Sequence, residues 1–361
     1  MDTTPATGSR FALEPFRALR LADSYVGDPI ANRVFARPYR SVPGRLRDWR
    51  RKRHLRLDPR PALYLHEYTS AGVSIRGIVA LLDLNGAAGR VFPHEDVHPD
   101  QMRQLADRMA EMSLNPAPIL LMHRGPASVR EVLTATAAGP PDLTYTDRAD
   151  QLQRIWRITD PQVQATLEDA LADARAVIAD GHHRYAAAVR LQAQRAGTAW
   201  DQTLVMLIDQ ADTPLQLCAI HRTIPRLTLS TVEKVSAERG DDFRRHPGSH
   251  EALAELEDAV VLHDGQHWAT LRPTGASPLL VTAVHETLLP AWKVREERLV
   301  FHHTAAEALA RAGQGLAVLL PAPTIDQVAS SARSGQLLPQ KATSFQPKPH
   351  VGVLMRDLRD G

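Results

Sequence analysis

A run of six residues combines a carboxylate, a glycine, two imidazoles and a guanidinium group, and it is the part of the sequence best suited to chemistry: Asp180-Gly181-His182-His183-Arg184-Tyr185. It follows an apolar strand-like stretch and precedes a helix-like one. The first amides of a helix lack partners within the helix, and together with the helix dipole they favour an anion. Gly181 permits close backbone approach, and Arg184 offers a planar, charged donor fork for phosphate oxygens. The run therefore predicts a phosphate-binding turn.

The two histidines of the run have more than one interpretation. His182 and His183 can donate hydrogen bonds or transfer protons near neutral pH, so both are candidate catalytic groups. Neighbouring positions lie about 100° apart on a helix, which makes a poor zinc pair, and no metal site is predicted from side chains. In the alternative interpretation, Asp180 caps the helix and both histidines fill polar surface. The helix is expected to bury one stripe: Tyr185, Ala186, Val189 and Ala193.

Cationic pairs elsewhere in the chain are further candidate ligands. His221-Arg222 follows an apolar stretch at 215–220 and is either a second anion contact or a surface pair. Lys341 and Lys348 lie in a Pro-flanked loop and are candidate ligands of substrate or phosphate. His302-His303 is expected at the surface.

The elements that must position these residues alternate between strand-like and helix-like patterns, which favours a mixed α/β (α+β) fold. We expect the first region, residues 1–230, to carry the phosphate-binding turn. The second, 231–361, is expected to be another α/β region that contributes Lys341 and Lys348, with a polar join near 233–250. Strands are expected at 62–68 and 74–84 around Ala71-Gly72, and at 119–122, 176–179, 204–208, 268–271 and 316–320; helices are expected at 99–112 and from Asp160-Pro161 towards 174.

Composition limits the function classes. The chain has 361 residues, 43% of them hydrophobic, and a formal net charge of +2, so bulk charge gives no support for coating a polyanion. A basic stretch between Arg45 and Arg56 is either a solvated helix face or a phosphate or nucleic-acid contact. The single cysteine, Cys218, excludes an internal disulfide and is expected to be buried and inert. No signal-like core and no run of about 18 apolar residues occurs, so we expect a soluble cytoplasmic protein without membrane contact.

The hexapeptide resembles the signature of a widespread prokaryotic family often called the HHRY family. Further blocks resemble that family in the same order along most of the chain: Pro15-Phe16-Arg17, Phe92-Pro93-His94-Glu95, residues 115–119, residues 152–160, His221-Arg222 and residues 338–348. Two blocks depart from it. Arg37-Pro38-Tyr39-Arg40 has Arg40 in place of an acid, and Lys341-Ala342-Thr343 has alanine in place of serine.

The Gly-His-His-Arg-Tyr turn is also similar to turns of the ParB/sulfiredoxin-like superfamily, which includes free serine kinases. This resemblance implies a ParB-like core, with the phosphates of ATP or ADP carried by Gly181, His182, His183 and Arg184. His182 stands where sulfiredoxin has its catalytic cysteine, so reduction of an oxidised thiol is not expected. Mg²⁺ would bind mainly through phosphate oxygens.

Phosphoryl transfer also needs a group that orients the nucleophile's proton. The serine kinases of the superfamily use a glutamate from an earlier segment, and the resemblance makes Glu95 the candidate base. Glu95 lies between a strand and a helix, where a carboxylate can face a cleft. Glu67 is a rival, and Glu95 could instead be a first-turn charge that stabilises the helix dipole.

The leading hypothesis is a nucleotide-dependent kinase of free serine or a similar small hydroxy compound, with nucleotide and hydroxy amino acid as its partners. One alternative is a non-catalytic nucleotide-binding regulator, DNA-associated through the Arg45 to Arg56 stretch. Another is a non-kinase biosynthetic enzyme whose turn holds an anionic substrate. The near-neutral bulk charge argues against nucleic acid as the main partner.

Overall fold

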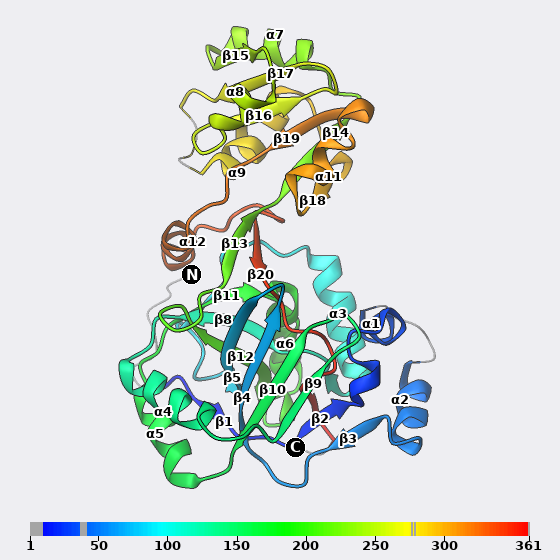
Figure 1. Cartoon of the computed structure of the whole chain (residues 1–361), viewed down its shortest axis with the longest axis vertical. Coiled ribbons are helices and arrows are strands. Elements are labelled where there is room, and N and C mark those ends of the chain that lie inside the picture. Colours follow the sequence, from blue (N-terminus) through cyan, green and yellow to red (C-terminus); the bar gives the residue numbers. More distant parts are fainter. Residues whose placement is uncertain (1–9, 37–41, 276, 278, 360–361) are drawn as a thin grey trace. The chain divides into compact units, whose positions relative to one another are not determined.

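A computed structural model describes residues 10–36, 42–275, 277 and 279–359. It confirms the expected mixed α/β fold, with sheets and helices in both halves of the chain (Figure 1). The departure at Arg37-Pro38-Tyr39-Arg40 lies outside the described residues. Among the described residues, no helix is both long and apolar enough to cross a membrane.

The chain divides into two compact units. Unit 1 takes in the described parts of residues 1–93, 97–215 and 347–361, and unit 2 takes in residues 94–96 and 216–346. The sequence prediction has one boundary, after residue 230, and assigns Lys348 to the second region. In the structure Lys348 belongs to unit 1, because the chain returns to that unit at Pro347.

Unit 1 is built on a nine-stranded sheet whose main path runs β6-β11-β8-β12-β5-β4-β10-β9, with β1 paired to β5. β8 and β12 are parallel, whereas β11 runs antiparallel to β8. The expected hairpin at Ala71-Gly72 is confirmed, and both turn residues have positive φ (48° and 80°), as a tight hairpin turn requires. The strands are β1 (Leu13–Glu14), β4 (Leu63–Ser70), β5 (Val73–Asp83), β6 (Val91–Phe92), β8 (Ile119–His123), β9 (Leu143–Thr146), β10 (Leu152–Ile158), β11 (Ala176–Asp180) and β12 (Gln202–Asp209).

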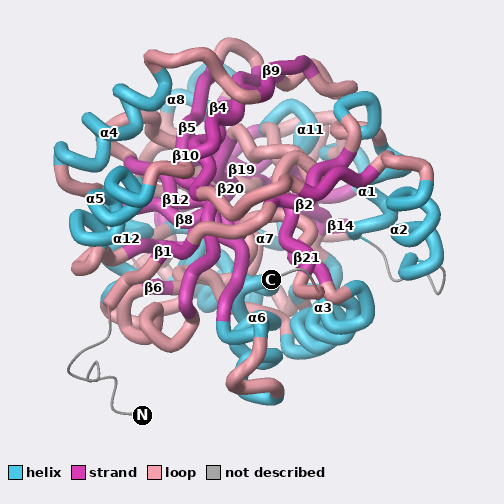
Figure 2. The backbone as a smooth tube through the Cα atoms, turned by 90° about the horizontal axis from the view of Figure 1, so that it is seen from below, coloured by secondary structure: helices cyan, strands magenta, loops and turns pink. Residues whose placement is uncertain are grey.

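Two helix pairs pack with this sheet. Helices α4 (Ala127–Ala137) and α5 (Pro161–Leu171) join the main core through Leu133 and Leu167. Helices α3 (Pro99–Met112) and α6 (His182–Gln194) lie beside each other and form a second cluster (Figure 2). The helix expected at 99–112 is therefore confirmed, and its methionines pack in a core. The carboxyl end of β11 leads directly into α6, so these packed layers fix the turn between them.

The apolar stripe expected for α6 is confirmed at Tyr185, which packs against both core clusters, but is wrong at Val189 and Ala193. The helix buries Ala187, Ala188 and Leu191 against α3, whereas Val189 is 40% exposed. Two adjacent alanines are small enough to let the α6 backbone approach Met109 on α3, and this contact sets the rotation of the helix.

A four-stranded sheet, in the order β3-β2-β21-β7, completes unit 1. It joins β2 (Ala18–Leu21), β3 (Leu55–Leu57) and β7 (Leu114–Asn115) to the C-terminal strand β21 (Met355–Asp357). Between β2 and β3 the chain forms helices α1 (Pro29–Ala36) and α2 (Val42–Arg51). The basic stretch begins on α2. Most of its charged side chains are exposed, but Arg50 forms an ion pair with the buried Asp357.

Unit 2 contains a six-stranded sheet ordered β15-β17-β16-β19-β14-β18 and a two-stranded sheet of β13 and β20. The sequence predicts a polar linker between the two regions near residues 233–250. This prediction is wrong, because those residues form most of α7 and all of β15. Cys218 lies on β13 and is partly exposed, so the prediction of a buried thiol is also wrong. The strands are β13 (Gln216–Ala219), β14 (His221–Pro225), β15 (Asp242–His246), β16 (Val260–His263), β17 (Trp268–Arg272), β18 (Val300–His302), β19 (Gly315–Leu319) and β20 (Thr343–Gln346). The helices are α7 (Leu229–Arg239), α8 (Ser249–Ala254), α9 (Leu280–Ala283), a π-helical turn (Val284–Leu288), α10 (Leu289–Ala291), α11 (Ala305–Leu309) and α12 (Ile325–Arg333).

Candidate functional site

The β11–α6 turn has the geometry that the sequence predicts. β11 ends at Asp180, Gly181 adopts the left-handed conformation (φ 97°, ψ 29°), and α6 begins at His182. A Cβ at position 181 would lie 2.9 Å from Nη2 and 3.0 Å from Nε of Arg184. The positive φ favours glycine at this position, and the missing Cβ leaves room for the guanidinium that lies against it.

Arg184 fastens this turn to the segment before β8. Its Nη1 donates to the carbonyl oxygens of Ala117 (3.1 Å) and Pro118 (2.7 Å), and its Nη2 donates to Oδ2 of Asp180 at 2.6 Å. The N-cap residue of α6 is Gly181, which has no side chain, so the interpretation of Asp180 as a helix cap is wrong. In this structure the Asp180 carboxylate instead serves as the partner of a guanidinium group.

Lys348, from the C-terminal segment, is the second cation on Asp180, and its Nζ donates to Oδ1. Burial alone would raise the pKa of the Asp180 carboxyl. The nearby charges of Arg184 and Lys348, with a smaller contribution from His182, outweigh burial and hold that pKa below its ordinary value of 3.8. One carboxylate thus faces two cations at the amino end of a helix, which leaves the turn with positive charge in excess.

Buried polar groups hold the segment that carries Lys348. The Tyr68 hydroxyl donates to the carbonyl oxygen of Pro347 (2.8 Å), and Nε2 of Gln151 donates to that of Lys348 (3.0 Å). Nδ1 of His350 lies 2.6 Å from Oδ2 of Asp147. Sequence reasoning missed these supporting residues, because Tyr68, Asp147 and Gln151 are ordinary polar residues of a strand or turn that lie far from Lys348 in the sequence.

The two histidines of the turn differ in their surroundings. His182 is buried, so the surface interpretation is wrong for it. Nε2 of His183 accepts from the backbone N–H of His98 at 3.2 Å, next to the start of α3. The structure thus brings together Asp180, Gly181, His182, His183, Arg184 and Lys348 in unit 1.

The two candidate bases have different surroundings. Glu67, on β4 of unit 1, accepts from Nη1 of Arg154 on β10 at 2.9 Å. Glu95 belongs to unit 2, where it pairs with Leu338 in an isolated parallel bridge. Its Oε1 accepts from the backbone N–H of Lys341 at 3.0 Å. Glu95 therefore does not lie in the first turn of a helix, and the helix-dipole interpretation is wrong.

His221 and Arg222 lie on β14 in unit 2, and both are buried, so the interpretation as a surface pair is wrong. Burial, with the charges of Arg222 and His302, lowers the pKa of His221 to about 4. His302 is buried as well, with its Nε2 2.9 Å from the Thr223 hydroxyl, which corrects the surface position expected for it. Lys341 is exposed in the loop before β20.

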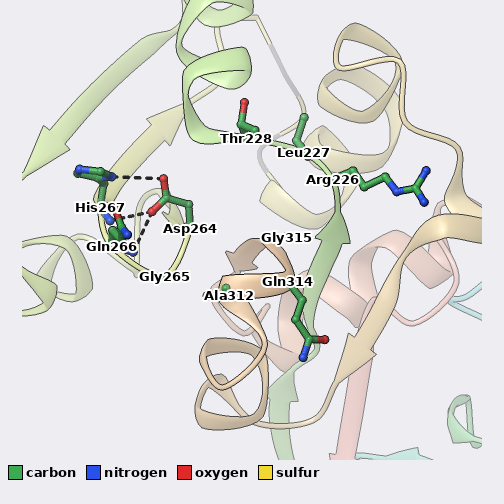
Figure 3. A pocket seen from close by; sticks show the side chains of 11 residues that line it. Arg226, Leu227, Thr228, Asp264, Gly265, Gln266, His267, Ala312, Gln314 and Gly315 are labelled. Carbon is green, nitrogen blue, oxygen red and sulfur yellow. Dashed lines mark hydrogen bonds and ion pairs between the residues drawn. The ribbon is translucent and has the colours of Figure 1, made fainter.

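Two of the cavities in the described part of the chain lie in unit 2. One of 520 Å³ lies between the start of α7, the Asp264–His267 turn and the loop before β19 (Figure 3). Its Arg226 side chain points away from the Gly265 turn. The other, of 990 Å³, is lined by His221, Arg272 and many apolar side chains. Within the part of the chain that the structure describes, no three His, Cys, Asp or Glu side chains group as metal ligands.

Comparison with solved structures finds distant likenesses. A free serine kinase in complex with AMP is 16% identical, with a TM-score of 0.44, and the alignment covers 76% of this chain and 92% of that one. C-terminally truncated SbnI from Staphylococcus aureus is 11% identical, with a TM-score of 0.47, over 77% of this chain and 87% of that one. A conserved hypothetical protein from Pyrococcus furiosus is 16% identical, with a TM-score of 0.42, over 76% and 95%. Likeness at this level assigns no activity to this chain.

No curated protein matches the sequence. A protein family does match it, over residues 9–294, a range that includes the β11–α6 turn, Glu95 and His221-Arg222. The match spans well over half of the chain, and the chain therefore belongs to the family described as "Protein of unknown function (DUF1015)".

Proposed function

We propose that the protein is a nucleotide-dependent kinase that phosphorylates free serine or a similar small hydroxy compound, with the nucleotide phosphates at the β11–α6 turn. The observation that carries the proposal is the Asp180 carboxylate held between Arg184 and Lys348 at the amino end of α6. The likeness of the Gly-His-His-Arg-Tyr turn to phosphate-binding turns of the ParB-like superfamily supports the same ligand.

The two cations have different parts in this proposal. Arg184 makes three hydrogen bonds and its side chain is 21% exposed, so it keeps the shape of the turn. Lys348 is 41% exposed and its Nζ has one described partner, Asp180. A polyphosphate carries more negative charge than one carboxylate, so it can draw the Lys348 ammonium group to itself. Mg²⁺, bound mainly through phosphate oxygens, would neutralise further charge.

The base remains a choice between two glutamates, and the family resemblance makes Glu95 the first candidate. Its Oε1 accepts from the backbone N–H of Lys341, whereas Glu67 accepts from the guanidinium of Arg154. His221, Arg222 and Lys341 stay predictions as nucleotide or substrate ligands, and His182 and His183 stay candidate catalytic groups.

In the proposed reaction, the substrate hydroxyl gives its proton to the carboxylate base while its oxygen forms a bond to the terminal phosphorus. The bond from that phosphorus to the bridging oxygen breaks, and the nucleotide leaves with one phosphate fewer. Charge on the transferred group is stabilised by the helix amides and by Lys348.

The test is direct. The purified protein is incubated with Mg²⁺, ATP or ADP, and serine, threonine or homoserine, with alanine as a control that lacks the hydroxyl group. Phosphorus NMR should show a new phosphate ester with serine or one of its analogues and none with alanine. Nucleotide binding without any product would favour the regulator, and the absence of both would favour an enzyme of another anionic substrate. The Lys348→Met variant should lower product formation in the same assay.

A further inference from the structure

Arg222, on β14, is a buried arginine with unusual partners. Its side chain donates to the carbonyl oxygens of Ile220 and Lys341, the latter from Nη2 at 3.0 Å, and the same Nη2 lies 3.2 Å from Nε2 of His285. Its Nε is buried without a hydrogen-bond partner, and none of the described carboxylates forms an ion pair with it. Burial lowers the pKa of Arg222 to about 10, and the more distant Glu95 and Glu296 raise it in part. A charge buried at this cost needs each of its contacts.

The contact with His285 fixes the state of the imidazole. Arginine has donors and no acceptor, so Nε2 of His285 accepts, and the ring proton lies on Nδ1. That proton is donated to Oε1 of Glu296 at 2.7 Å. Burial and the neighbouring Arg222 lower the pKa of His285 and outweigh the opposing effect of Glu296, which keeps the ring neutral. His285 lies in the π-helical turn, a departure from α-helix that is frequent at functional sites.

Lys341, whose carbonyl oxygen accepts from Arg222, has an unusual backbone conformation. It adopts φ 60°, a conformation that side chains with a Cβ disfavour. Both polar groups of its backbone are bound by side chains from other segments: its N–H donates to Oε1 of Glu95, and its carbonyl oxygen accepts from Arg222. Local strain of this kind persists only where the surroundings hold it, and it is common at functional sites.

The segment that carries Glu95 is also bound through its backbone. The N–H of Leu338 donates to the carbonyl oxygen of His94 at 2.7 Å, and the N–H of Asp96 donates to that of Leu338 at 3.1 Å. These bonds fix the Glu95 backbone against the loop before β20. The N–H of Lys341 helps to direct its carboxylate, and Arg222 holds the carbonyl oxygen of the same residue.

We propose that Arg222, oriented by His285 and Glu296, positions the Glu95 carboxylate through the backbone of Lys341. The inference rests on the proposed function where it treats Glu95 as the base, whereas the positioning itself needs no nucleotide. Arg222, His285 and Glu296 are positioning residues. The contact between Arg222 and His285 should also depend on pH. A protonated His285 cannot accept from Arg222, so acid weakens the contact and loosens Lys341; Arg222 and Glu296 are the charged groups that act on His285.

Hydrogen exchange at the Lys341 amide measures the positioning without any substrate. In His285→Leu the acceptor is lost, and we expect this amide to exchange at least tenfold faster at pH 7. His285→Gln restores an acceptor and should return the rate towards that of the parent. Unchanged exchange in a folded His285→Leu protein would overturn the proposal.

A milder pair of variants keeps the proposal testable if His285→Leu does not fold. Glu296 is largely exposed, so Glu296→Ala should fold, and we expect it to speed Lys341 exchange about threefold or more. Glu297→Ala is the matched control, because Glu297 is exposed and has no described partner, and it should match the parent. Equal exchange in the two variants would overturn the inference.

Turnover provides the second measurement, provided that the parent forms a phosphate ester. His285→Leu or Glu296→Ala should lower kcat by about tenfold and leave KM for the nucleotide unchanged. The difference from the parent should narrow as the pH falls, because protonation of His285 weakens the same contact in the parent. A parent that forms no product would refute the proposed function, whereas the exchange experiment would still decide the positioning. Product formation with unaltered kcat in both variants would refute the positioning alone.

Discussion

Lys348 forms an ion pair with Asp180, a residue 168 positions earlier in the chain. The contact brings the C-terminal segment to the β11–α6 turn within unit 1. Arg184 binds the other oxygen of the same carboxylate, so the turn has one acid shared by two cations. Because Lys348 is the more exposed of the two cations, we expect it to be the one that the proposed phosphate recruits.

Replacement of Lys348 by methionine tests this role. Lys348→Met keeps most of the unbranched side chain and removes its charge, and ATP affinity measured by calorimetry should fall about tenfold, or about 1.4 kcal/mol. The free energy of unfolding should change by less than about 1 kcal/mol, because the pair is partly exposed. Lys234→Met, at an exposed position on α7, should leave affinity unchanged. Equal affinities of the two variants would remove Lys348 from the site.

Arg184→Lys should affect both folding and binding. A lysine can reach one of the acceptors now bound by Arg184, but it cannot reach Asp180 and both carbonyl oxygens together. We expect the free energy of unfolding in urea to fall by about 2 kcal/mol and nucleotide affinity to fall about tenfold. Arg190→Lys, an exposed position on the same helix, is the control. A variant with full stability would contradict the contacts described for Arg184.

Local signals made much of unit 1 predictable. The β4–β5 hairpin follows from Ala71-Gly72 between β-branched runs, and the helix at Pro99–Met112 follows from a proline at its start and an apolar stripe. The left-handed Gly181 follows from a glycine between a strand and a helix. Each of these features depends on residues that are close in the sequence, where propensity and pattern act directly.

The rest depends on contacts between distant segments. The face that α6 buries is set by Ala187 and Ala188 against α3. The spacing of apolar residues along α6 alone predicts that Val189 is buried, whereas it is exposed. The burial of Arg222 needs acceptors from the π-helical turn and from the loop at Lys341, which sequence spacing does not reveal. For the same reason, the two candidate bases could be named from the sequence, but their partners could not.

Glu95→Gln tests the candidate base. The amide can still accept from the N–H of Lys341, so the loop should keep its structure, but it cannot take up a proton. Turnover should fall by about 100-fold while nucleotide affinity stays constant, as measured by product formation and calorimetry. Glu67→Gln is the matched comparison and should lose little turnover. The reverse pattern would assign the base to Glu67.

The lowered pKa of Asp180 predicts how stability depends on pH. A carboxyl whose pKa is lower in the folded state contributes stability above its unfolded pKa, near 3.8, and loses it as the pH falls through the lower folded value. Asp180→Asn lacks this contribution. The parent should exceed the variant by about 2 kcal/mol in free energy of unfolding above about pH 5, and the gap should narrow below about pH 4. A gap that stays constant down to pH 2.5 would contradict the assigned ionisation.

The basic stretch separates the kinase from a DNA-associated regulator. Arg50 must be kept in this test, because its ion pair with Asp357 belongs to unit 1's structure. The exposed Arg45, Arg47 and Arg53 are replaced together by glutamine. If they contact DNA phosphates, the slope of log K against log salt should become shallower by about 2 to 3. We expect instead that the parent shows no tight, salt-sensitive DNA binding and that the triple variant keeps its turnover, because the turn proposed to bind phosphate is built from residues outside this stretch. Loss of tight DNA binding in the variant, in a protein that phosphorylates no small acceptor, would replace the kinase proposal with the regulator.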